Sequence, residues 1–212
     1  MKKGTGLIIA FVVWTVLILI VDVQALGQNG TNIGFATFNL WFHKLTGVHM
    51  SIYTITDWLG LVPICVCLFF GSFGLMQLIR RKSLFKVDYD IIILGIYYIV
   101  VIAIFFAFEV VPINYRPILI DGVMEASYPS STTLLVLSVM PTLVFQANRR
   151  LNNTFLKNGI FIYSVLFSII MVIGRLIAGV HWFTDIVGGI LLSAGVFYIY
   201  KAVILLCDEE NK

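Results

Sequence analysis

The chain has 212 residues, of which 60% are hydrophobic and only 12% are charged, with a formal net charge of +3. This charged share is about half that of an ordinary soluble domain, and the apolar runs are too long for one, so a water-soluble globular domain is excluded. The small positive charge does not indicate nucleic-acid binding, because the basic residues lie in loops between apolar segments.

Six apolar segments predict an all-α polytopic membrane protein, a six-helix transmembrane bundle formed by a single membrane domain over residues 1–212. In chain order the expected helices span 6–25, 58–79, 90–109, 132–147, 159–178 and 184–206. The first follows Met1-Lys2-Lys3, and Val23-Gln24-Ala25 is a weak candidate for signal-peptidase cleavage. Its apolar run is long for a signal peptide, so we expect an uncleaved helix. The pattern predicts no oligomeric state.

The positions of Lys and Arg predict how the helices are oriented. If successive helices alternate in direction, 11 of the 14 basic residues fall on one side of the membrane. The positive-inside rule makes this side cytoplasmic, so both termini are inside and segments 26–57, 110–131 and 179–183 face outward. We therefore expect a multi-pass plasma-membrane protein whose functional site is extracytoplasmic.

The first outward segment, residues 26–57, begins rich in Gly and Asn and becomes amphipathic between Phe35 and Leu45. This pattern predicts a short helix lying in the extracytoplasmic membrane interface. His43 and His49 lie here, and we interpret them as interfacial polar residues rather than ligands.

The second outward segment, residues 110–131, contains Tyr115-Arg116-Pro117 and, at its end, the run Pro129-Ser130-Ser131-Thr132. A Pro-Ser-Ser-Thr run directly before an apolar segment is typical of a helix N-terminus, where Ser or Thr caps the exposed N–H groups. The same N–H groups and the helix dipole suit an anion. With Arg116 on the same face, this segment is a candidate anion-binding site.

The third outward turn belongs to the stretch 174–185, which places Arg175, His181 and Asp185 at spacings of 6 and 4. Charged groups are costly in hydrocarbon, so their clustering at the edge of an apolar segment requires a reason. One reason is chemistry: a guanidinium holds an anion, an imidazole attacks it and a carboxylate orients the imidazole. The alternative is a snorkelling arginine beside an interfacial His-Trp pair.

These residues resemble the motifs of the type 2 phosphatidate phosphatase superfamily, which comprises integral membrane lipid phosphatases with six helices. Arg175-x5-His181-x3-Asp185, followed by Ile186-Val187-Gly188-Gly189, resembles the third signature of that family. Arg116-Pro117 and Pro129-Ser130 match parts of its first signature, Lys-x6-Arg-Pro, and its second, Pro-Ser-Gly-His, in the expected order. The resemblance covers roughly residues 90–200.

The resemblance implies a phosphatase that acts on a phosphorylated membrane lipid without a metal or other cofactor. His181 would be the nucleophile that forms a phosphohistidine, and Asp185 would hold its other ring nitrogen. The phosphoryl oxygens would be bound by Arg116, Arg175, Ser130 and Ser131, the serines partly through their backbone N–H groups.

Four positions depart from the family motifs. Ser131 stands in place of the glycine of the second signature, and Gly174 in place of the serine that usually precedes the arginine of the third. Glu109 stands where the family has the lysine of the first signature, and Thr132 where it has the histidine that protonates the leaving oxygen. A hydroxyl has no useful acidity near neutral pH, so Thr132 cannot replace that acid. Candidate proton donors nearby are Glu125, Asp121 and Tyr128, and the alternative reading of each is a solvated loop residue.

These departures favour a substrate with a good leaving group and leave other functions open. The conjugate acid of a lipid alkoxide has a pKa of about 16, whereas the second pKa of a phosphate monoester is about 6. A lipid diphosphate expels the phosphate monoester, which is the better leaving group, whereas a lipid monophosphate expels the alkoxide. This difference favours a lipid diphosphate, such as a polyprenyl diphosphate, over a lipid monophosphate. In one alternative, Glu109 pairs with a cationic head group in a phosphotransferase. In another, the chain binds or transports a lipid phosphate without catalysis.

Overall fold

The computed structural model describes residues 1–210, and this part of the chain contains helices and loops but no β-strand. The α-helices are α1 (Lys2–Ile20), α2 (Ala36–Thr46), α3 (Met50–Leu59), α4 (Leu61–Arg81), α5 (Tyr89–Val110), α6 (Ser131–Arg150), α7 (Thr154–Ala178) and α8 (Phe183–Glu210). Two short 3-10 turns, η1 (Gln28–Gly30) and η2 (Leu84–Lys86), lie in connections. Lys212, one of the basic residues used to predict orientation, lies outside the described residues.

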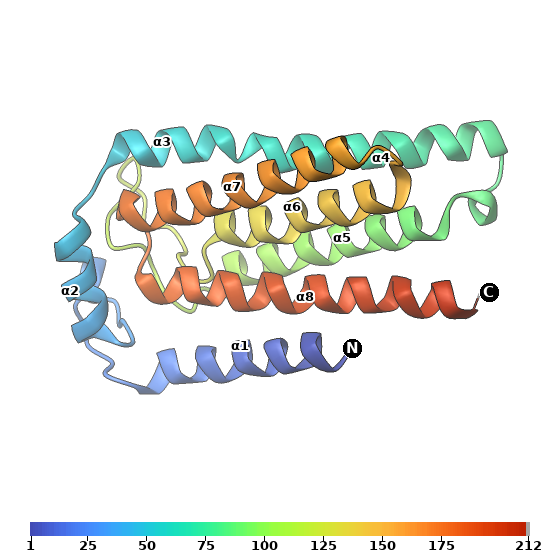
Figure 1. The fold of residues 1–212 in the computed structure, drawn as a ribbon. Helices are drawn as coiled ribbons and strands as arrows, with labels where there is room; N and C mark the ends of the chain where they lie inside the picture. Colours follow the sequence, from blue (N-terminus) through green and yellow to red (C-terminus); the bar gives the residue numbers. More distant parts are fainter. Residues whose placement is uncertain (211–212) are drawn as a thin grey trace.

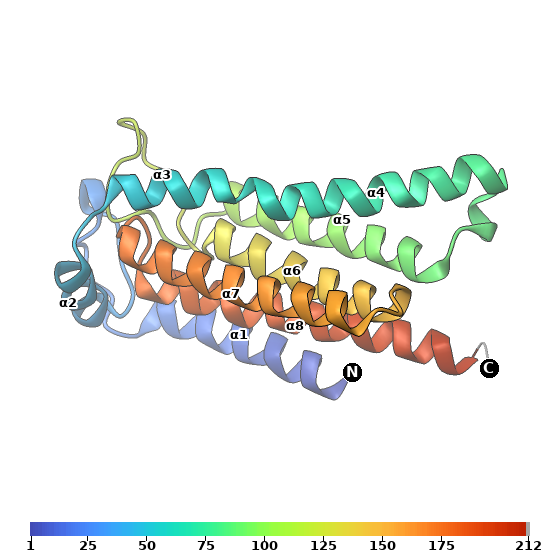
Figure 2. The same cartoon turned by 45° about the horizontal axis from the view of Figure 1, so that its top comes forward.

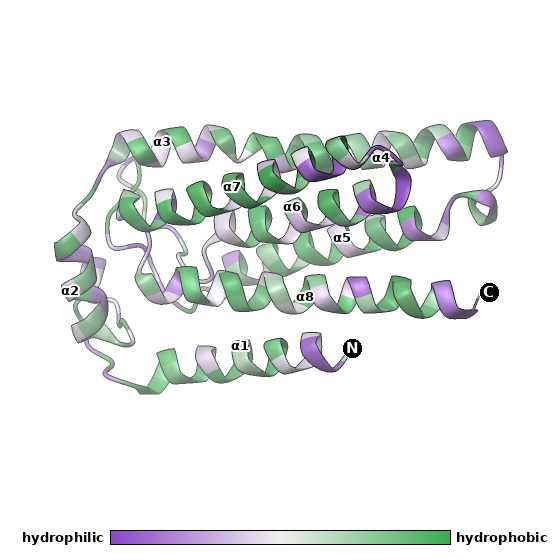
Figure 3. Cartoon of the chain, in the orientation of Figure 1, coloured by the Kyte–Doolittle hydropathy of each residue, from purple (hydrophilic) through white to green (hydrophobic). Residues whose placement is uncertain are grey.

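Six spans within residues 1–210 are long and apolar enough to cross a membrane: α1, the continuous rod of α3 and α4, α5, α6, α7 and α8. The long rods lie roughly side by side (Figure 1), and apolar residues predominate along most of their length while hydrophilic residues gather at their ends (Figure 3). The predicted six-helix transmembrane bundle is therefore confirmed, and α2 is a short helix at one end of it.

The second span starts well before the predicted position. Met50–Arg81 forms a 32-residue rod, whereas hydropathy placed the helix at 58–79. The rod is interrupted only at Gly60, because Pro63 has no N–H to donate to the carbonyl of Leu59 four residues earlier. The part missed by hydropathy is α3, whose polar residues Ser51, Thr54, Thr56 and Asp57 interrupt the apolar pattern at this end of the rod.

The first span also differs from its predicted bounds of 6–25, since α1 ends at Ile20. Asp22 adopts a left-handed backbone conformation, with φ of 44°. Its carboxylate accepts a hydrogen bond from the Thr37 N–H at 2.7 Å, at the start of α2. This contact turns the chain out of the helix although the apolar residues continue beyond it.

α6 is the most buried span and contacts α4, α5, α7 and α8. α1 packs mainly on α8, where two glycines allow close approach. A Cβ on Gly4 would lie 2.9 Å from the backbone nitrogen of Ile199, and a Cβ on Gly195 would lie 2.6 Å from Ile8 Cδ1. Small residues at such contacts are typical of helix packing in membranes.

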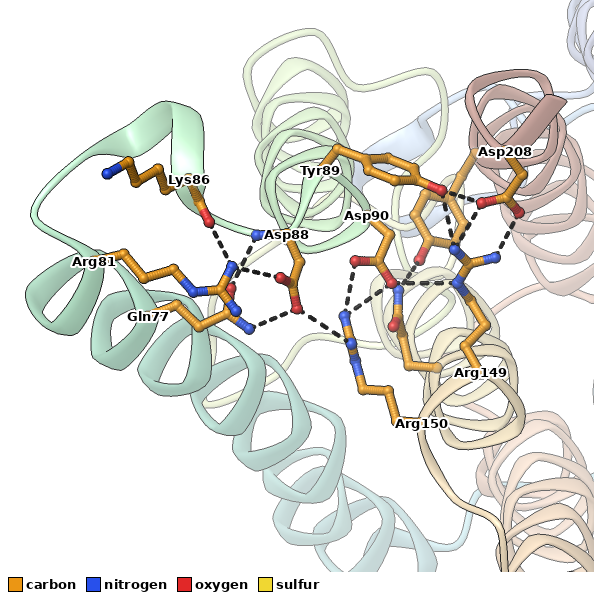
Figure 4. A network of polar contacts seen from close by, with 11 residues as sticks. Gln77, Arg81, Lys86, Asp88, Tyr89, Asp90, Arg149, Arg150 and Asp208 are labelled. Atoms are coloured by element: carbon orange, nitrogen blue, oxygen red, sulfur yellow. Dashed lines mark hydrogen bonds and ion pairs between the residues drawn. The ribbon is translucent and has the colours of Figure 1, made fainter. Parts of the chain in front are cut away.

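The two ends of the bundle differ in character. The N-terminus and the described end of α8 lie at one end, whereas α2, residues 111–130 and the junction of α7 with α8 lie at the other (Figures 1 and 2). Close to the end that holds the termini, a network of ion pairs and hydrogen bonds links α4, α5, α6 and α8 (Figure 4). Its centre is Asp90, a buried carboxylate held by Arg149 at 3.2 Å and by Arg150 at 2.8 Å.

Candidate active site

The sequence motifs meet at the end of the bundle remote from the termini. Five of the six residues expected to act in the phosphate chemistry come from helix ends or the turn between helices. They are Arg175 in the last turn of α7, His181 in the turn before α8, Asp185 in the first turn of α8, Ser130 directly before α6 and Ser131 at its first position. Arg116 comes from the 111–130 connection. All of them except the half-buried Ser131 are buried.

Local sequence explains how His181 is presented. Gly179 ends α7 in the left-handed conformation, with φ of 70°, and a Cβ there would overlap the carbonyl of Gly47, so only glycine fits. His181 lies two residues after Gly179, and α8 begins two residues after His181. At the start of α8 the Asp185 carboxylate accepts a hydrogen bond from the Trp182 N–H at 2.8 Å. Asp185 therefore caps this helix as well as facing the imidazole.

The 111–130 connection is held in a fixed shape by backbone hydrogen bonds. Arg116 N–H donates to the carbonyl of Glu125 at 3.1 Å, and Ser127 N–H donates to the carbonyl of Asn114 at 2.8 Å. The Trp182 indole N–H donates to the carbonyl of Tyr115 at 2.8 Å, which ties the connection to the start of α8. These bonds bring Arg116 and Ser127 beside residues that lie more than fifty positions later in the chain.

Ser127 lies between His181 and Asp185. The two side chains are 3.8 Å apart from Nδ1 to Oδ2, too far for the direct hydrogen bond that the sequence predicted. Ser127 Oγ donates to Asp185 Oδ2 and lies 3.1 Å from His181 Nδ1, while the Ser127 carbonyl lies 3.2 Å from the same nitrogen. Asn114 Nδ2 donates to the other Asp185 oxygen at 3.2 Å. With both Ser127 oxygens acting as acceptors, Nδ1 carries the ring proton and Nε2 keeps its lone pair.

The imidazole is neutral at physiological pH. Burial lowers the pKa of His181 to about 4, and the nearby positive charges of Arg116 and Arg175 act in the same direction. The negative charge of Asp185 opposes this shift but does not reverse it. A neutral imidazole with a free Nε2 lone pair is the form that can act as a nucleophile.

Several buried polar atoms of this site have no hydrogen-bond partner within the described residues: His181 Nε2, Arg116 Nη1, Arg175 Nε and Ser130 Oγ. Buried polar groups are nearly always paired, so a group of unpaired ones at one site indicates a ligand. Two guanidinium nitrogens and a hydroxyl are donors suited to phosphoryl oxygens. The site thus has the composition of an anion site with a neutral imidazole at its edge.

Arg175 is held by α3, which the sequence did not assign to the site. Its Nη2 contacts Thr132 Oγ1 and pairs with Asp57 Oδ1 at 3.1 Å. Its guanidinium carbon lies 4.9 Å from the centroid of the Tyr53 ring, and that of Arg116 lies 5.8 Å from the same ring. One aromatic ring therefore contacts both arginines, which brings the two guanidinium groups into the same site.

α3 could have been recognised by its pattern. Tyr53, Thr56 and Asp57 have the spacing i, i+3, i+4, which places them on one face of a helix directly before an apolar segment. Ser127 has no comparable signal, because its role depends on contacts with residues 54 and 58 positions away.

The expected backbone cradle is only partly available. The Ser130 N–H donates to the carbonyl of Asp185 at 3.1 Å, so it is not free to bind an anion as predicted. Ser130 also makes no side-chain cap to α6. The N–H of Ser131 stands in the first turn, where helix amides lack intrahelical acceptors and the dipole is positive.

The remaining predicted residues occupy different positions around the site. Glu125 pairs with Arg116, with 3.1 Å between Oε2 and Nε. Glu109 is exposed at the end of α5 and lines a small cavity with Ser127 and Ser131. Tyr128 is buried, and its hydroxyl is bonded to Thr15 of α1 at 2.7 Å, so it joins helices rather than facing the arginines.

A groove leads from the site along the outside of the bundle. It has a volume of about 660 Å³ and is bounded by α4, α5 and α6, with Asp57, Ser131 and Thr132 at one end and apolar side chains elsewhere. A second groove of about 640 Å³ continues between α4 and α5 and shares Cys67, Leu68 and Tyr98 with the first. An apolar channel with a polar end of this kind fits a lipid whose head group enters the arginine site.

Comparison with known proteins agrees with the motifs. Residues 110–207 match the PAP2 superfamily. The resemblance to this superfamily that the motifs indicate is thereby confirmed. The fold of the chain is similar to the crystal structure of a transmembrane PAP2 type phosphatidylglycerolphosphate phosphatase from Bacillus subtilis, with a TM-score of 0.66 and 17% identity over 100% of this chain and 98% of that one. No curated protein sequence matches the chain.

These two similarities support a membrane lipid phosphatase in general terms. The matched region contains Arg116, Ser130, Arg175, His181 and Asp185. Tyr53 and Asp57 lie outside it, so the contribution of α3 comes from the structure of this chain alone.

Proposed function

We propose that the protein removes phosphate from a lipid phosphate or diphosphate through a phosphohistidine intermediate on His181. The observation that carries this proposal is the group of unpaired buried atoms, His181 Nε2, Arg116 Nη1, Arg175 Nε and Ser130 Oγ, near the polar end of an apolar groove. Three of these atoms are suited to phosphoryl oxygens and the fourth to phosphorus itself.

In the first step the phosphoryl group lies against Arg116, Arg175 and Ser130. His181 Nε2 attacks phosphorus, a nitrogen–phosphorus bond forms, and the bond from phosphorus to the leaving oxygen breaks with its electron pair on that oxygen. The imidazole becomes positively charged, and its Nδ1–H is held by Ser127, which passes the interaction to the Asp185 carboxylate. In the second step water attacks the phosphohistidine, and phosphate and free His181 are released.

The length of the groove favours a long single chain as the lipid part. Along α4 the lining residues extend from Gly60 to Leu78, which corresponds to about 27 Å at 1.5 Å per residue. This is most of the roughly 30 Å thickness of the hydrocarbon core, whereas the tails of a diacyl lipid occupy only one leaflet. A polyprenyl chain can follow the groove over its whole length.

The leaving group favours a diphosphate. Thr132 cannot protonate the leaving oxygen, and a phosphate monoester, with a second pKa of about 6, leaves far more readily than an alkoxide, whose conjugate acid has a pKa of about 16. Together the groove and Thr132 support a polyprenyl diphosphate as substrate. The distribution of basic residues supports a plasma-membrane protein with this site on the extracytoplasmic face and both termini inside.

A headgroup phosphotransferase is a second candidate, because carboxylates surround the arginines. Asp57 pairs with Arg175, Glu125 pairs with Arg116, and Glu109 lies nearby. A cationic head group such as ethanolamine would be attracted to these carboxylates. Supplying a lipid alcohol as acceptor separates the two functions, since a transferase forms a new phosphodiester and a phosphatase releases only inorganic phosphate.

The test is phosphate release from polyprenyl diphosphate by the full-length protein in detergent. His181→Ala should abolish turnover, and substrate labelled in its terminal phosphate should leave a trapped phosphoenzyme only when His181 is present. His49→Ala is the matched control, because His49 is exposed and bonded to the carbonyl of Thr46. Near wild-type turnover in His181→Ala would remove the nucleophile assignment. Saturable lipid-phosphate binding without turnover by the wild type would favour a binding or transport protein.

A further inference from the structure

The chemistry proposed above leaves one proton without a source. The leaving oxygen carries the electron pair of the broken bond, and the residue at the expected position of the acid is Thr132. Diphosphate substrates reduce this need but do not remove it, because a proton must also be taken from the water that attacks the phosphohistidine. A group that can both give and take a proton is therefore required near Thr132.

Asp57 and Thr132 contact the same nitrogen, Nη2 of Arg175. Arg175 Nη2 pairs with Asp57 Oδ1 at 3.1 Å and also contacts Thr132 Oγ1. Arg175 is almost completely buried, whereas 61% of the Asp57 side chain is exposed. Asp57 thus reaches from the arginine toward open space.

That open space is the polar end of the apolar groove. Asp57, Ser131 and Thr132 line it together with apolar residues of α4 and α5. When a lipid chain fills the groove and its phosphoryl group lies at the arginines, the oxygen that joins the two must lie at this junction. Asp57 lines the groove at this junction together with Ser131 and Thr132.

α3 is fixed in this position by Arg175. Arg175 Nη1 lies 3.4 Å from both the carbonyl oxygen of Tyr53 and Thr56 Oγ1, and Thr56 is buried. Asp57 is the next residue on the same helix, so its backbone is anchored while its side chain remains exposed. A catalytic side chain is best placed when its backbone is held rigidly and the side chain itself faces the cavity, as that of Asp57 faces the groove.

The other candidate proton donors are placed less well. Tyr128 is bonded to Thr15 of α1, and burial raises the pKa of its hydroxyl. Glu125 is paired with Arg116. Asp121 is exposed in the turn formed by residues 120–123. Glu109 lines a small cavity beside Tyr128 and Pro129 rather than the groove.

We propose that Asp57 is the proton donor and acceptor of the reaction, in the role that Thr132 cannot perform. A phosphoryl group that arrives with one oxygen protonated takes over the Arg175 Nη2 donor and passes its proton to the Asp57 carboxylate, so that a carboxylic acid faces the leaving oxygen. In the first step the carboxylic acid gives its proton to that oxygen as the phosphorus–oxygen bond breaks. In the second step the carboxylate takes a proton from the attacking water, which restores the acid. This proposal rests on the phosphohistidine chemistry above. With Asp57 as the acid, the site can also expel a lipid alcohol, so a lipid monophosphate becomes a substrate beside the diphosphate that the absence of an acid at Thr132 favours.

The experiment compares Asp57→Asn with wild type on a polyprenyl monophosphate and the matching diphosphate, both in detergent with the full chain. The kcat on the monophosphate should fall by about 10²–10⁴-fold, the usual contribution of general acid–base catalysis. The fall on the diphosphate should be much smaller, because its leaving group needs less protonation. Asp57→Glu should restore part of the monophosphate activity.

Two controls separate catalysis from binding and folding. Inorganic phosphate should inhibit Asp57→Asn at least as strongly as wild type and raise its melting temperature, because both arginines remain. Asp121→Asn should change neither substrate's kinetics, since Asp121 is exposed and Asn tolerates its left-handed backbone conformation. If Asp57→Asn does not fold, Asp57→Glu carries the comparison, and a lower kcat confined to the monophosphate supports the proposal.

The outcomes distinguish this proposal from the function on which it rests. An unchanged kcat with a lowered KM in Asp57→Asn would mean that Asp57 only occupies Arg175 until phosphate arrives, which overturns the proposal and leaves the phosphatase intact. Equal falls on both substrates would also overturn it, since the leaving group would then be irrelevant. Absence of turnover by the wild type on either substrate would overturn the proposed function and this assignment together.

Discussion

The side chain of Ser127 changes how the histidine and aspartate of this site work together. Asp185 does not touch the imidazole but accepts hydrogen bonds from Ser127, Asn114 and the Trp182 backbone. The Asp185 Oδ2 atom lies 3.8 Å from His181 Nδ1, and the Ser127 hydroxyl contacts both atoms. The arrangement fixes the ring orientation while keeping the imidazole in a buried site beside two arginines. Burial therefore dominates the protonation of His181.

We predict that His181 stays neutral when the pH is lowered from 8 to 5. Its pKa is lowered from 6.5 to about 4 by burial, so only the unfolded chain binds a proton there within this range. The sign follows: the contribution of His181 to stability decreases as the pH falls from 6.5 toward 4. Nitrogen NMR of labelled histidine can follow this, because the chain has only three histidines and His181→Asn identifies the resonance. A titration near pH 6.5 would contradict the buried state.

At the scale of helices, sequence predicted the spans well and their polar extensions poorly. A chain crossing lipid must satisfy its backbone within helices, so hydropathy detects each span directly. α3 escaped detection because Tyr53, Thr56 and Asp57 interrupt the apolar pattern where they turn toward Arg175. Arg175, His181 and Asp185 were found because they belong to one short motif. Ser127 was not, because only the fold brings it to them.

The helices are also joined by the ion-pair network at the end of the bundle remote from the site (Figure 4). Asp90 of α5 holds Arg149 and Arg150 of α6, and Arg149 in turn binds Asp208 of α8 at 2.7 Å. Asp88, outside the span, binds Arg81 of α4 at 2.7 Å and accepts a hydrogen bond from Gln77, and these contacts keep its pKa below the usual value. These side chains connect four of the six spans.

Asp90→Asn should destabilise the bundle without altering the site. The change removes a carboxylate that pairs with both Arg149 and Arg150. Breaking a fully buried ion pair lowers the free energy of unfolding by about 3–5 kcal/mol. Because both arginines are about one quarter exposed, we expect a smaller decrease of about 2 kcal/mol. Unfolding in detergent with increasing denaturant measures the loss. Glu209→Gln, an exposed change near the same end, should have no effect. A variant as stable as wild type would show that packing, not this network, holds α5 to α6.

At the scale of the whole molecule, the charge distribution and the site occupy opposite ends. The site, α2 and the 111–130 connection lie together at one end, and the network containing Arg81, Arg149 and Arg150 lies near the other, with the described termini (Figures 1 and 4). An alternating six-span bundle produces this separation whichever way it is inserted. Its orientation in the membrane therefore rests on the 11 basic residues that cluster at the terminal side.

We predict that Asp121 is extracytoplasmic and Asn152 cytoplasmic. Both are exposed and lie in connections at opposite ends of the bundle, Asp121 beside the site and Asn152 between α6 and α7. In a background without the three native cysteines, Asp121→Cys should react with a membrane-impermeant maleimide on intact cells, and Asn152→Cys only after permeabilisation. The physical reason is that the loops rich in Arg and Lys stay on the side of synthesis. The reverse pattern would place the phosphate site in the cytoplasm, and labelling of both positions from one side would refute the alternating six-span arrangement itself.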